Sequence, residues 1–210
     1  MLTLAMVLCA AGVVQAASIA VSDASFESHQ VANYQYSPQL SGYLPGWTFG
    51  PGTGLTPGNT DFNSPSNIPD GTQVAFLQGD GSNVSQAIDG FAAFTTYTVN
   101  LFIGTRFANG GYDGNADVGV SIDGTQIGQT TGLSSSTYFS EYSYSFTVYN
   151  TPGTHSLSIF NISAPGDHTA FVDNVSIESV APEPATFALF GIAILGLGVR
   201  FARTRRTMSY

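Results

Sequence analysis

The amino-acid sequence predicts an all-β protein: a single jelly-roll β-sandwich followed by one C-terminal transmembrane helix. Three observations lead to this prediction. Apolar and polar residues alternate in several stretches, segments rich in glycine and proline separate those stretches, and no helical pattern of apolar residues precedes the C-terminal tail. Because the predicted strands follow one another without intervening helices, a sandwich or jelly roll of antiparallel strands is expected.

The N-terminal segment, residues 1–17, has the pattern of a secretory signal peptide. Residues 2–14 form an apolar run of suitable length, and Val14 and Ala16 supply small residues before a cleavage site. No lysine or arginine precedes this run, which departs from the usual pattern. Cleavage after Ala16 or Ala17 would make Ser18 the first residue of the exported domain, which we expect to span residues 18–179.

The first part of this domain carries few strand signals. Residues 23–62 are rich in glycine and proline, and they predict long ordered loops around one short strand at residues 47–49. Trp47, the single tryptophan, lies in an apolar stretch and is expected to plug the core. Long loops at the rim of a sandwich are common binding sites.

The remainder of the domain alternates with the two-residue period of half-buried strands. Residues 96–103 place Tyr97, Val99, Leu101 and Ile103 on one face. Residues 118–122 lead through an Asp-Gly pair into another strand, which predicts a hairpin. Further strands are expected at residues 142–148, 154–162 and 170–177, for a total of roughly nine.

The charges are distributed very unevenly. The chain has 14 acidic residues, all but Glu183 before residue 180, and its 5 basic residues are arginines, of which only Arg106 lies outside the tail. Such an acidic domain repels nucleic acid, so no nucleic-acid partner is expected. The only cysteine, Cys9, lies in the predicted signal peptide, so the exported domain has no disulfide.

The C-terminal tail has the composition of a membrane anchor. Residues 185–202 are almost entirely apolar, and as a helix they would extend about 27 Å, close to the thickness of a hydrocarbon core. The basic residues of the tail gather on its C-terminal side, within residues 200–206. This asymmetry predicts that the C-terminus stays in the cytoplasm and that the domain is exported. The membrane-orienting residues are Arg200, Arg203, Arg205 and Arg206.

The order of these features resembles a known sorting signal. Pro182, Glu183 and Pro184 precede the apolar helix and the arginines, as in the PEP-CTERM sorting domain of Gram-negative bacteria that make exopolysaccharide. The resemblance covers residues 180–206. It implies an exosortase partner that cleaves near the motif, anchoring in the inner membrane before processing, and a location at the cell surface or in the extracellular matrix afterwards.

The exported domain has a weaker resemblance to galactose-binding-like jelly rolls found in carbohydrate-binding modules. It lies in Ser25-Phe26-Glu27, in Gly46-Trp47, in residues 84–88 and in the final Phe171-Val172-Asp173-Asn174-Val175. Those modules often start with Asn-Gly, whereas this chain has Asp23-Ala24. The resemblance implies a structural Ca²⁺ held by Glu27 and Asp173, because Ca²⁺ takes carboxylate oxygens. Alternatively, Glu27 caps a loop and Asp173 makes a local turn.

A rival cation site is the run from Asp113 to Asp117, which offers oxygens at alternating positions. It does not follow the EF-hand loop, since Val118 stands where that loop requires glycine.

Sugar binding would use aromatic rings and polar groups at the loop rim. Arg106 could clamp an acidic sugar or form an internal ion pair. The candidate ligand-binding residues are Tyr34, Tyr36, Tyr43, Arg106, Tyr112 and Tyr138.

No motif in the chain indicates catalysis. His29, His155 and His168 lack the spacing of metal ligands, and the sequence contains neither a nucleophile elbow nor a phosphate-binding loop. The sequence therefore predicts an exported, exosortase-processed surface or biofilm-matrix protein that is not an enzyme and binds exopolysaccharide. The alternatives are a structural or adhesive protein that recognises other proteins, and a polysaccharide hydrolase.

Overall fold

A computed structural model of the chain describes residues 16–40, 44–62, 64–107, 114–134 and 138–180. These residues form a compact unit, Ala17–Val180. Nearly all of the predicted signal peptide and the tail after Val180 lie outside the described residues.

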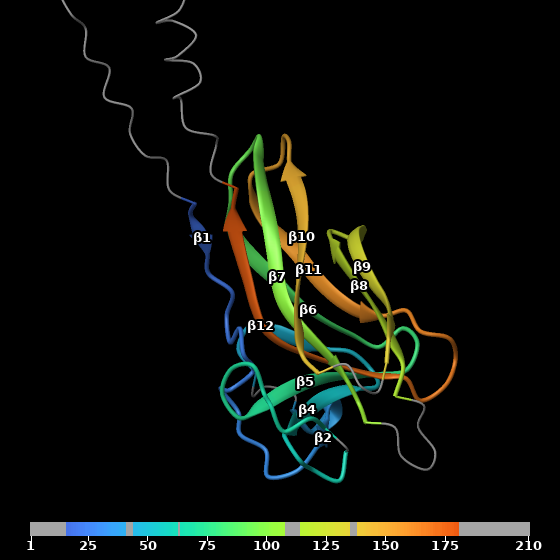
Figure 1. Cartoon of the computed structure of the whole chain (residues 1–210). Helices are drawn as coiled ribbons and strands as arrows, with labels where there is room; N and C mark the ends of the chain where they lie inside the picture. Colours follow the sequence, from blue (N-terminus) through green and yellow to red (C-terminus); the bar gives the residue numbers. More distant parts are fainter. Residues whose placement is uncertain (1–15, 41–43, 63, 108–113, 135–137, 181–210) are drawn as a thin grey trace, which may run out of the picture. The chain divides into compact units, whose positions relative to one another are not determined.

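Two antiparallel sheets make up this unit (Figure 1). The 7-stranded sheet contains, in spatial order, β10 (Ser140–Val148), β7 (Thr95–Thr105), β12 (Thr169–Ser179), β5 (Gln73–Gln78), β4 (Thr53–Pro57) and β2 (Gln35–Tyr36), with β1 (Ser18–Ile19) pairing with β12. The 5-stranded sheet contains β3 (Trp47–Phe49), β6 (Asn83–Phe91), β11 (Gly153–Asn161), β8 (Ala116–Ile122) and β9 (Thr125–Leu133). The one helix among the described residues, α1, is the short Ser37–Leu40.

The chain crosses repeatedly between the sheets from β5 onward. Its path places β5, β12, β7 and β10 side by side in one sheet, and β6, β11, β8 and β9 in the other. Strands distant in sequence therefore become neighbours, which is the arrangement of two Greek keys in a jelly roll. The prediction of an all-β jelly-roll sandwich is confirmed.

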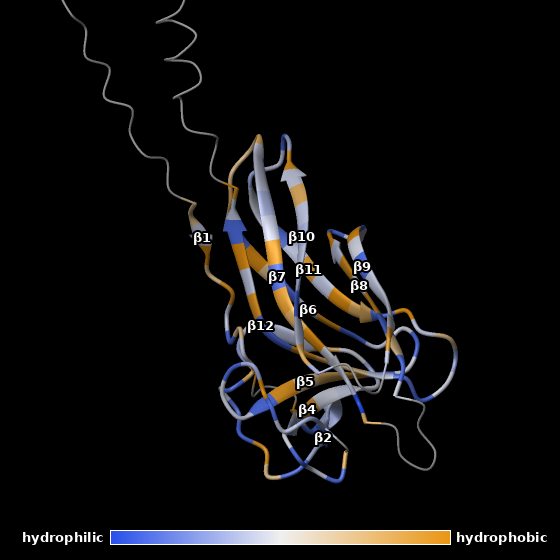
Figure 2. Ribbon diagram, in the orientation of Figure 1, coloured by the Kyte–Doolittle hydropathy of each residue, from blue (hydrophilic) through white to orange (hydrophobic). Residues whose placement is uncertain are grey.

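The core lies between the sheets and follows the predicted alternation. In β7, Tyr97, Val99, Leu101 and Ile103 are all buried. Figure 2 shows the same alternation as bands of contrasting hydropathy along the strands. Each such side chain contributes about 1.5–3 kcal/mol when it leaves water. Trp47 is buried as expected, and its indole N–H donates to the carbonyl of Asp23.

The prediction for residues 23–62 was wrong in detail. Besides β3, this region forms β2, α1 and β4. β4 is almost entirely buried although it contains one glycine and one proline, and its neighbour β5 is buried on both faces. Strands covered on both sides show no alternation, so the period of the sequence cannot reveal them. A second apolar cluster of Phe62, Val74, Phe76 and Phe171 covers the outer face of this part of the sheet.

The sandwich has two distinct ends. At the end that we call the pocket end, β5 and β7 finish and β12 begins, since Thr169 pairs with Gln78 and Ala170 with Thr105. At the opposite end, which we call the exit end, β12 and β10 finish and β7 begins, since Ser179 pairs with Tyr97 and Val148 with Thr95.

Candidate functional site

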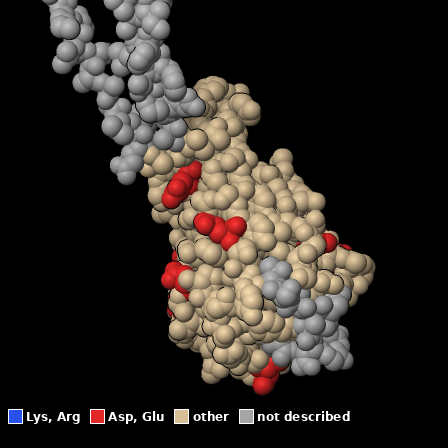
Figure 3. All heavy atoms as spheres, in the orientation of Figure 1, with Lys and Arg blue, Asp and Glu red and all other residues tan. Residues whose placement is uncertain are grey.

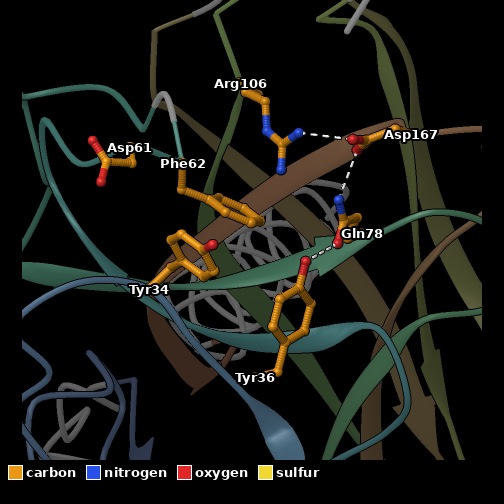
Figure 4. Close-up of a pocket in the computed structure, with 7 residues that line it drawn as sticks. All are labelled: Tyr34, Tyr36, Asp61, Phe62, Gln78, Arg106 and Asp167. Atoms are coloured by element: carbon orange, nitrogen blue, oxygen red, sulfur yellow. Dashed lines mark hydrogen bonds and ion pairs between the residues drawn. The ribbon is translucent and has the colours of Figure 1, made fainter. Parts of the chain in front are cut away.

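A small cavity of about 130 Å³ opens at the pocket end. The side chains that line it come from widely separated parts of the chain: β2 and the residue before it, the loop between β4 and β5, the end of β5, and the loops that follow β7 and precede β12. They are Tyr34, Tyr36, Asp61, Phe62, Gln78, Arg106 and Asp167, all labelled in Figure 4.

Arg106 lines this pocket and forms an ion pair with Asp167. Arg106 Nη1 is 2.9 Å from Asp167 Oδ2, and the arginine side chain is only 3% exposed, compared with 30% for the aspartate. The guanidinium carbon also lies 4.0 Å from the centre of the Phe62 ring, which gives a cation–π contact. Of the two roles that the sequence left open for Arg106, the structure contains the internal ion pair.

Hydrogen bonds connect this ion pair to Tyr36. Gln78 donates from Nε2 to Asp167 Oδ1 at 3.0 Å, and its Oε1 accepts the hydroxyl proton of Tyr36 (Figure 4). Burial raises the pKa of the Tyr36 phenol, and the positive charge of Arg106 opposes that shift only in part. The hydroxyl therefore stays protonated at neutral pH and serves as a donor.

Aromatic packing holds the two tyrosines in place. The Tyr34 ring lies 5.1 Å from the Phe62 ring, and the Tyr36 ring meets Phe76 edge to face at 5.1 Å. The two tyrosine rings themselves meet edge to face with centroids 6.0 Å apart. Such contacts fix the ring orientations and leave Tyr34 partly exposed at the pocket.

Gly54 allows β2 to carry Tyr36 into this position. Gly54 pairs with Tyr36 across β2 and β4, and a Cβ atom at Gly54 would collide with the carbonyl oxygen of Gln35 and with the Phe76 ring. Only glycine lets the two strands approach so closely. The local sequence thus contributes to the shape of the pocket.

The predicted ligand-binding residues divide into three groups. Tyr34, Tyr36 and Arg106 come together in the pocket. Tyr138 is 59% exposed and packs its ring against Phe107, with centroids 6.2 Å apart. The remaining two, Tyr43 and Tyr112, lie outside the described residues.

Sequence reasoning missed the other four lining residues, Asp61, Phe62, Gln78 and Asp167. Asp167 follows a Pro-Gly turn, and Asp61 belongs to a polar loop; neither setting distinguishes a site from an ordinary loop. Only the contacts across the sheet reveal their role.

The proposed metal ligand Glu27 holds the loop before β5. Its Oε1 accepts the N–H groups of Thr72 and Gln73, and its Oε2 accepts the side chains of Gln30 and Thr72. A carboxylate that accepts several donors fastens a loop firmly. The loop-capping role foreseen as an alternative for Glu27 is therefore present.

The second proposed ligand, Asp173, is fully buried in β12. Its oxygens accept the N–H groups of Asp70 and Asn174 at 2.9 and 2.8 Å. Burial raises the pKa of this carboxyl to about 7, helped by the charges of Asp70 and Glu27 and opposed by the two hydrogen bonds. The charges of Glu27 and Asp70 thus act directly on Asp173.

Within the described residues, no three or more histidine, cysteine, aspartate or glutamate side chains are grouped as a metal site would require. In the rival run, Asp113 lies outside those residues, and Asp117 accepts the N–H of Gly132 at 2.6 Å.

A second cavity, of about 370 Å³, lies at the exit end between β9 and β10. It contains the pair of His155 and Asp123, whose Nδ1 and Oδ2 atoms are 2.5 Å apart. The other ring nitrogen of His155 contacts the Thr151 carbonyl at 2.6 Å. Both ring nitrogens of His155 therefore have a hydrogen-bond partner. The sequence alone did not indicate either partner.

The sorting residues Pro182, Glu183 and Pro184 and the four tail arginines lie outside the described residues. In the part of the chain that the structure describes, no helix has the length and apolar character needed to cross a membrane.

Comparison with known proteins identifies the tail. Residues 180–206 match the model of the PEP-CTERM protein-sorting motif, so the resemblance noted in the sequence is confirmed. No curated protein matches the chain.

Solved structures share the fold of the domain. The chain is similar to an apo cyclase from Fischerella sp., with 20% identity, a TM-score of 0.53 and coverage of 80% of this chain and 98% of that one. It is also similar to a cyclase from Fischerella sp. TAU in complex with 4-(1H-indol-3-yl)butan-2-one, with 17% identity, a TM-score of 0.56 and coverage of 80% and 99%. A more distant match is a xylan-binding domain from Paenibacillus barcinonensis, with 12% identity, a TM-score of 0.47 and coverage of 65% and 87%.

A family model extends over nearly the whole sandwich. Residues 17–178, from β1 almost to the end of β12, match the model described as HpiC1 cyclase. Since the match covers more than half of the chain, the protein belongs to the HpiC1-like family.

Proposed function

We propose that this protein is an exported, exosortase-processed surface or matrix protein whose jelly-roll domain binds one neutral sugar residue of an extracellular polysaccharide without catalysis. The observation that carries the proposal is the convergence of Tyr34, Tyr36 and Arg106 in one cavity. Arg106 is far from the two tyrosines in the sequence, and each of the three is a candidate for sugar binding from the sequence alone.

The chemistry of the pocket suits a neutral polyol. Arg106 is already paired with Asp167, and Asp61 adds a further carboxylate, so the pocket offers no excess positive charge to an acidic sugar. Carboxylate, amide and phenol groups can accept and donate hydrogen bonds to sugar hydroxyls, and the ring of Tyr34 offers an apolar face.

The size of the pocket limits the ligand. Its volume of about 130 Å³ is well below the roughly 300–1,000 Å³ of sites for drug-sized molecules. We therefore expect it to hold one terminal or branching residue of a glycan, with the rest of the chain in solvent.

The sorting motif supports the cellular part of the proposal. An exosortase would recognise the Pro182-Glu183-Pro184 segment while the apolar tail anchors the precursor in the inner membrane. Processing would then place the domain on the surface or in the extracellular matrix of a Gram-negative bacterium.

A structural Ca²⁺ at Glu27 and Asp173 is also part of the proposal. The carboxylates are hard oxygen donors of the type that Ca²⁺ prefers, and a cation would offset the repulsion that Asp70 and Glu27 exert on the buried Asp173. The ion would connect the N-terminal loop to β12.

The family match favours a second candidate, a cyclase that acts on an indole-bearing small molecule. The 130 Å³ pocket is small for such a ligand, whereas the 370 Å³ cavity at the exit end is within the usual range. The two candidates therefore predict different ligands at different ends of the sandwich.

One binding experiment separates them. The full chain in detergent is titrated with a panel of neutral and acidic glycans and with 4-(1H-indol-3-yl)butan-2-one. The variant Y34A, which removes a partly exposed ring from the pocket, is expected to weaken glycan binding at least about tenfold, since burying such a face is worth about 1.5–3 kcal/mol. The control Y149A, at the opposite end, should retain full affinity.

Absence of glycan binding, or equal affinity in Y34A and the wild type, would contradict the sugar proposal. Binding and conversion of the indole ketone or a related substrate would establish the cyclase candidate instead.

A further inference from the structure

Large apolar side chains are exposed together at the exit end. Phe94, in the β6–β7 turn, is 78% exposed, and Tyr149, after β10, is 67% exposed. The backbone N–H of Phe94 donates to the carbonyl of Tyr149 at 3.1 Å, so the two turns are joined. Val180, 49% exposed, donates its N–H to the neighbouring Thr96.

The backbone conformation of Phe94 is unfavourable for the stability of the fold. Its φ of 54° lies in the left-handed region, which is unfavourable for a bulky side chain. Asparagine or glycine would satisfy this turn better, and a polar residue would suit water better. Neither backbone preference nor solvation explains a phenylalanine here, and such outliers point to a functional constraint.

The apolar surface continues beside Tyr149 into the 370 Å³ cavity. Ile122, Ile127, Phe146 and Val148 line this cavity together with Tyr149. The exit end thus presents two protruding rings next to an apolar hollow, rather than one isolated exposed residue.

The nearby acidic groups are mostly engaged. Asp123 pairs with His155, and Asp89 accepts the hydroxyl of Thr154. Glu178, near the end of β12, is exposed. On the face that Figure 3 shows, no acidic side chain lies at the tip where β10 ends and β7 begins. This end therefore suits an uncharged or zwitterionic surface better than an anionic one.

The length of the chain beyond Val180 limits the distance between this end and the anchor. The sorting motif match starts at residue 180, and the apolar run starts at Ala185. Five residues span at most about 18 Å even when fully extended. A precursor anchored by its tail therefore keeps the exit end close to the bilayer surface.

We propose that the exit end is a lipid-contact surface, on which Phe94 and Tyr149 insert into the interface of a zwitterionic bilayer while the precursor is anchored. Tyrosine favours this interfacial region, and phenylalanine buries its apolar ring at the boundary between headgroups and acyl chains. The contact would hold the domain upright on the membrane and present the segment around Glu183 to a membrane enzyme. This inference rests on the anchoring part of the proposed function.

The test uses the full chain reconstituted in phosphatidylcholine vesicles and fluorescence quenching by brominated lipids. The variant F94W places an indole at the proposed contact, and Y138W places one at a similarly exposed site near the pocket end. The wild type gives the background from the buried Trp47. We expect brominated lipid to quench the added emission of F94W at least twofold and to leave that of Y138W unchanged.

Vesicle flotation distinguishes a failure of the membrane anchor from a failure of the lipid-contact surface. If the chain floats with the vesicles but F94W and Y138W are quenched equally or not at all, the lipid-contact surface is overturned and anchoring stands. If the chain does not float, the anchor fails, and the contact surface fails with it. Replacing phosphatidylcholine by phosphatidylglycerol should weaken the quenching of F94W, because the exported domain as a whole is strongly acidic and is repelled by an anionic surface.

Discussion

Arg106 and Asp167 join the loop after β7 to the loop before β12, with 2.9 Å between Nη1 and Oδ2. The same two residues line the pocket, so they contribute both to the stability of this end of the sandwich and to the chemistry offered to a ligand.

Breaking this ion pair on one side should destabilise the domain. We expect R106M to lower the free energy of unfolding by roughly 2–4 kcal/mol. This is somewhat below the range for fully buried pairs, because solvent reaches Asp167. Urea denaturation measures the loss, and the double variant R106M/D167N should recover part of it. A loss below about 1 kcal/mol in R106M would mean that the pair is not coupled to folding.

In contrast to R106M, a substitution in the strained turn at Phe94 is not expected to destabilise the domain. F94N replaces an exposed ring by a residue that tolerates positive φ, so it should leave stability unchanged or raise it by up to about 1 kcal/mol. Thermal unfolding of F94N against the wild type tests this directly. Clear destabilisation would show that the ring packs within the domain and is not reserved for an external contact.

The His155–Asp123 pair should make stability depend on pH. Burial lowers the pKa of His155, but the Asp123 hydrogen bond, the Thr151 carbonyl and the Asp123 charge outweigh it, so the net pKa is raised. The pKa of Asp123 is lowered, chiefly by the Ser156 N–H and also by His155. A raised histidine pKa stabilises fully below pH about 6.5, and this effect is lost as pH rises through the folded-state value. A lowered aspartate pKa stabilises above pH about 4, and this effect is lost as pH falls through the folded-state value.

Consequently the pair contributes most between about pH 4 and 6.5. The stability difference between the wild type and H155Q, measured by urea denaturation, should be larger at pH 5.5 than at pH 8.5. A difference that does not change with pH would contradict the charged state assigned to His155.

Calcium should stabilise the domain through Asp173. If Ca²⁺ binds as proposed, an excess of about a hundredfold over its dissociation constant would add about 2.7 kcal/mol, visible as a higher melting temperature that a chelator reverses. D173N should lose this response, whereas D61N, which alters a carboxylate in the pocket, should keep it. An equal response in wild type and D173N would place any calcium elsewhere.

The candidate site could be predicted only in part. Tyr34 and Tyr36 could be proposed because they are aromatic residues in a predicted loop region, and Arg106 because it is the only arginine outside the tail. Phe62, Gln78 and Asp167 had no comparable signal, since their significance arises from contacts with residues tens of positions away. Asp123, the partner of His155, could not be predicted for the same reason.

The sequence by itself determined the all-β class, the strands from β7 onward and the sorting signal. Alternation is a local property that one buried face imposes on neighbouring residues, and a sorting motif is linear, so both can be read along the chain. Only the tertiary structure decided the positions of β2 and β4, the doubly buried β5 and the assembly of the pocket. These depend on which distant strands become neighbours in a jelly roll. The local sequence around residues such as Gly54 and Phe76 does not indicate that they will meet.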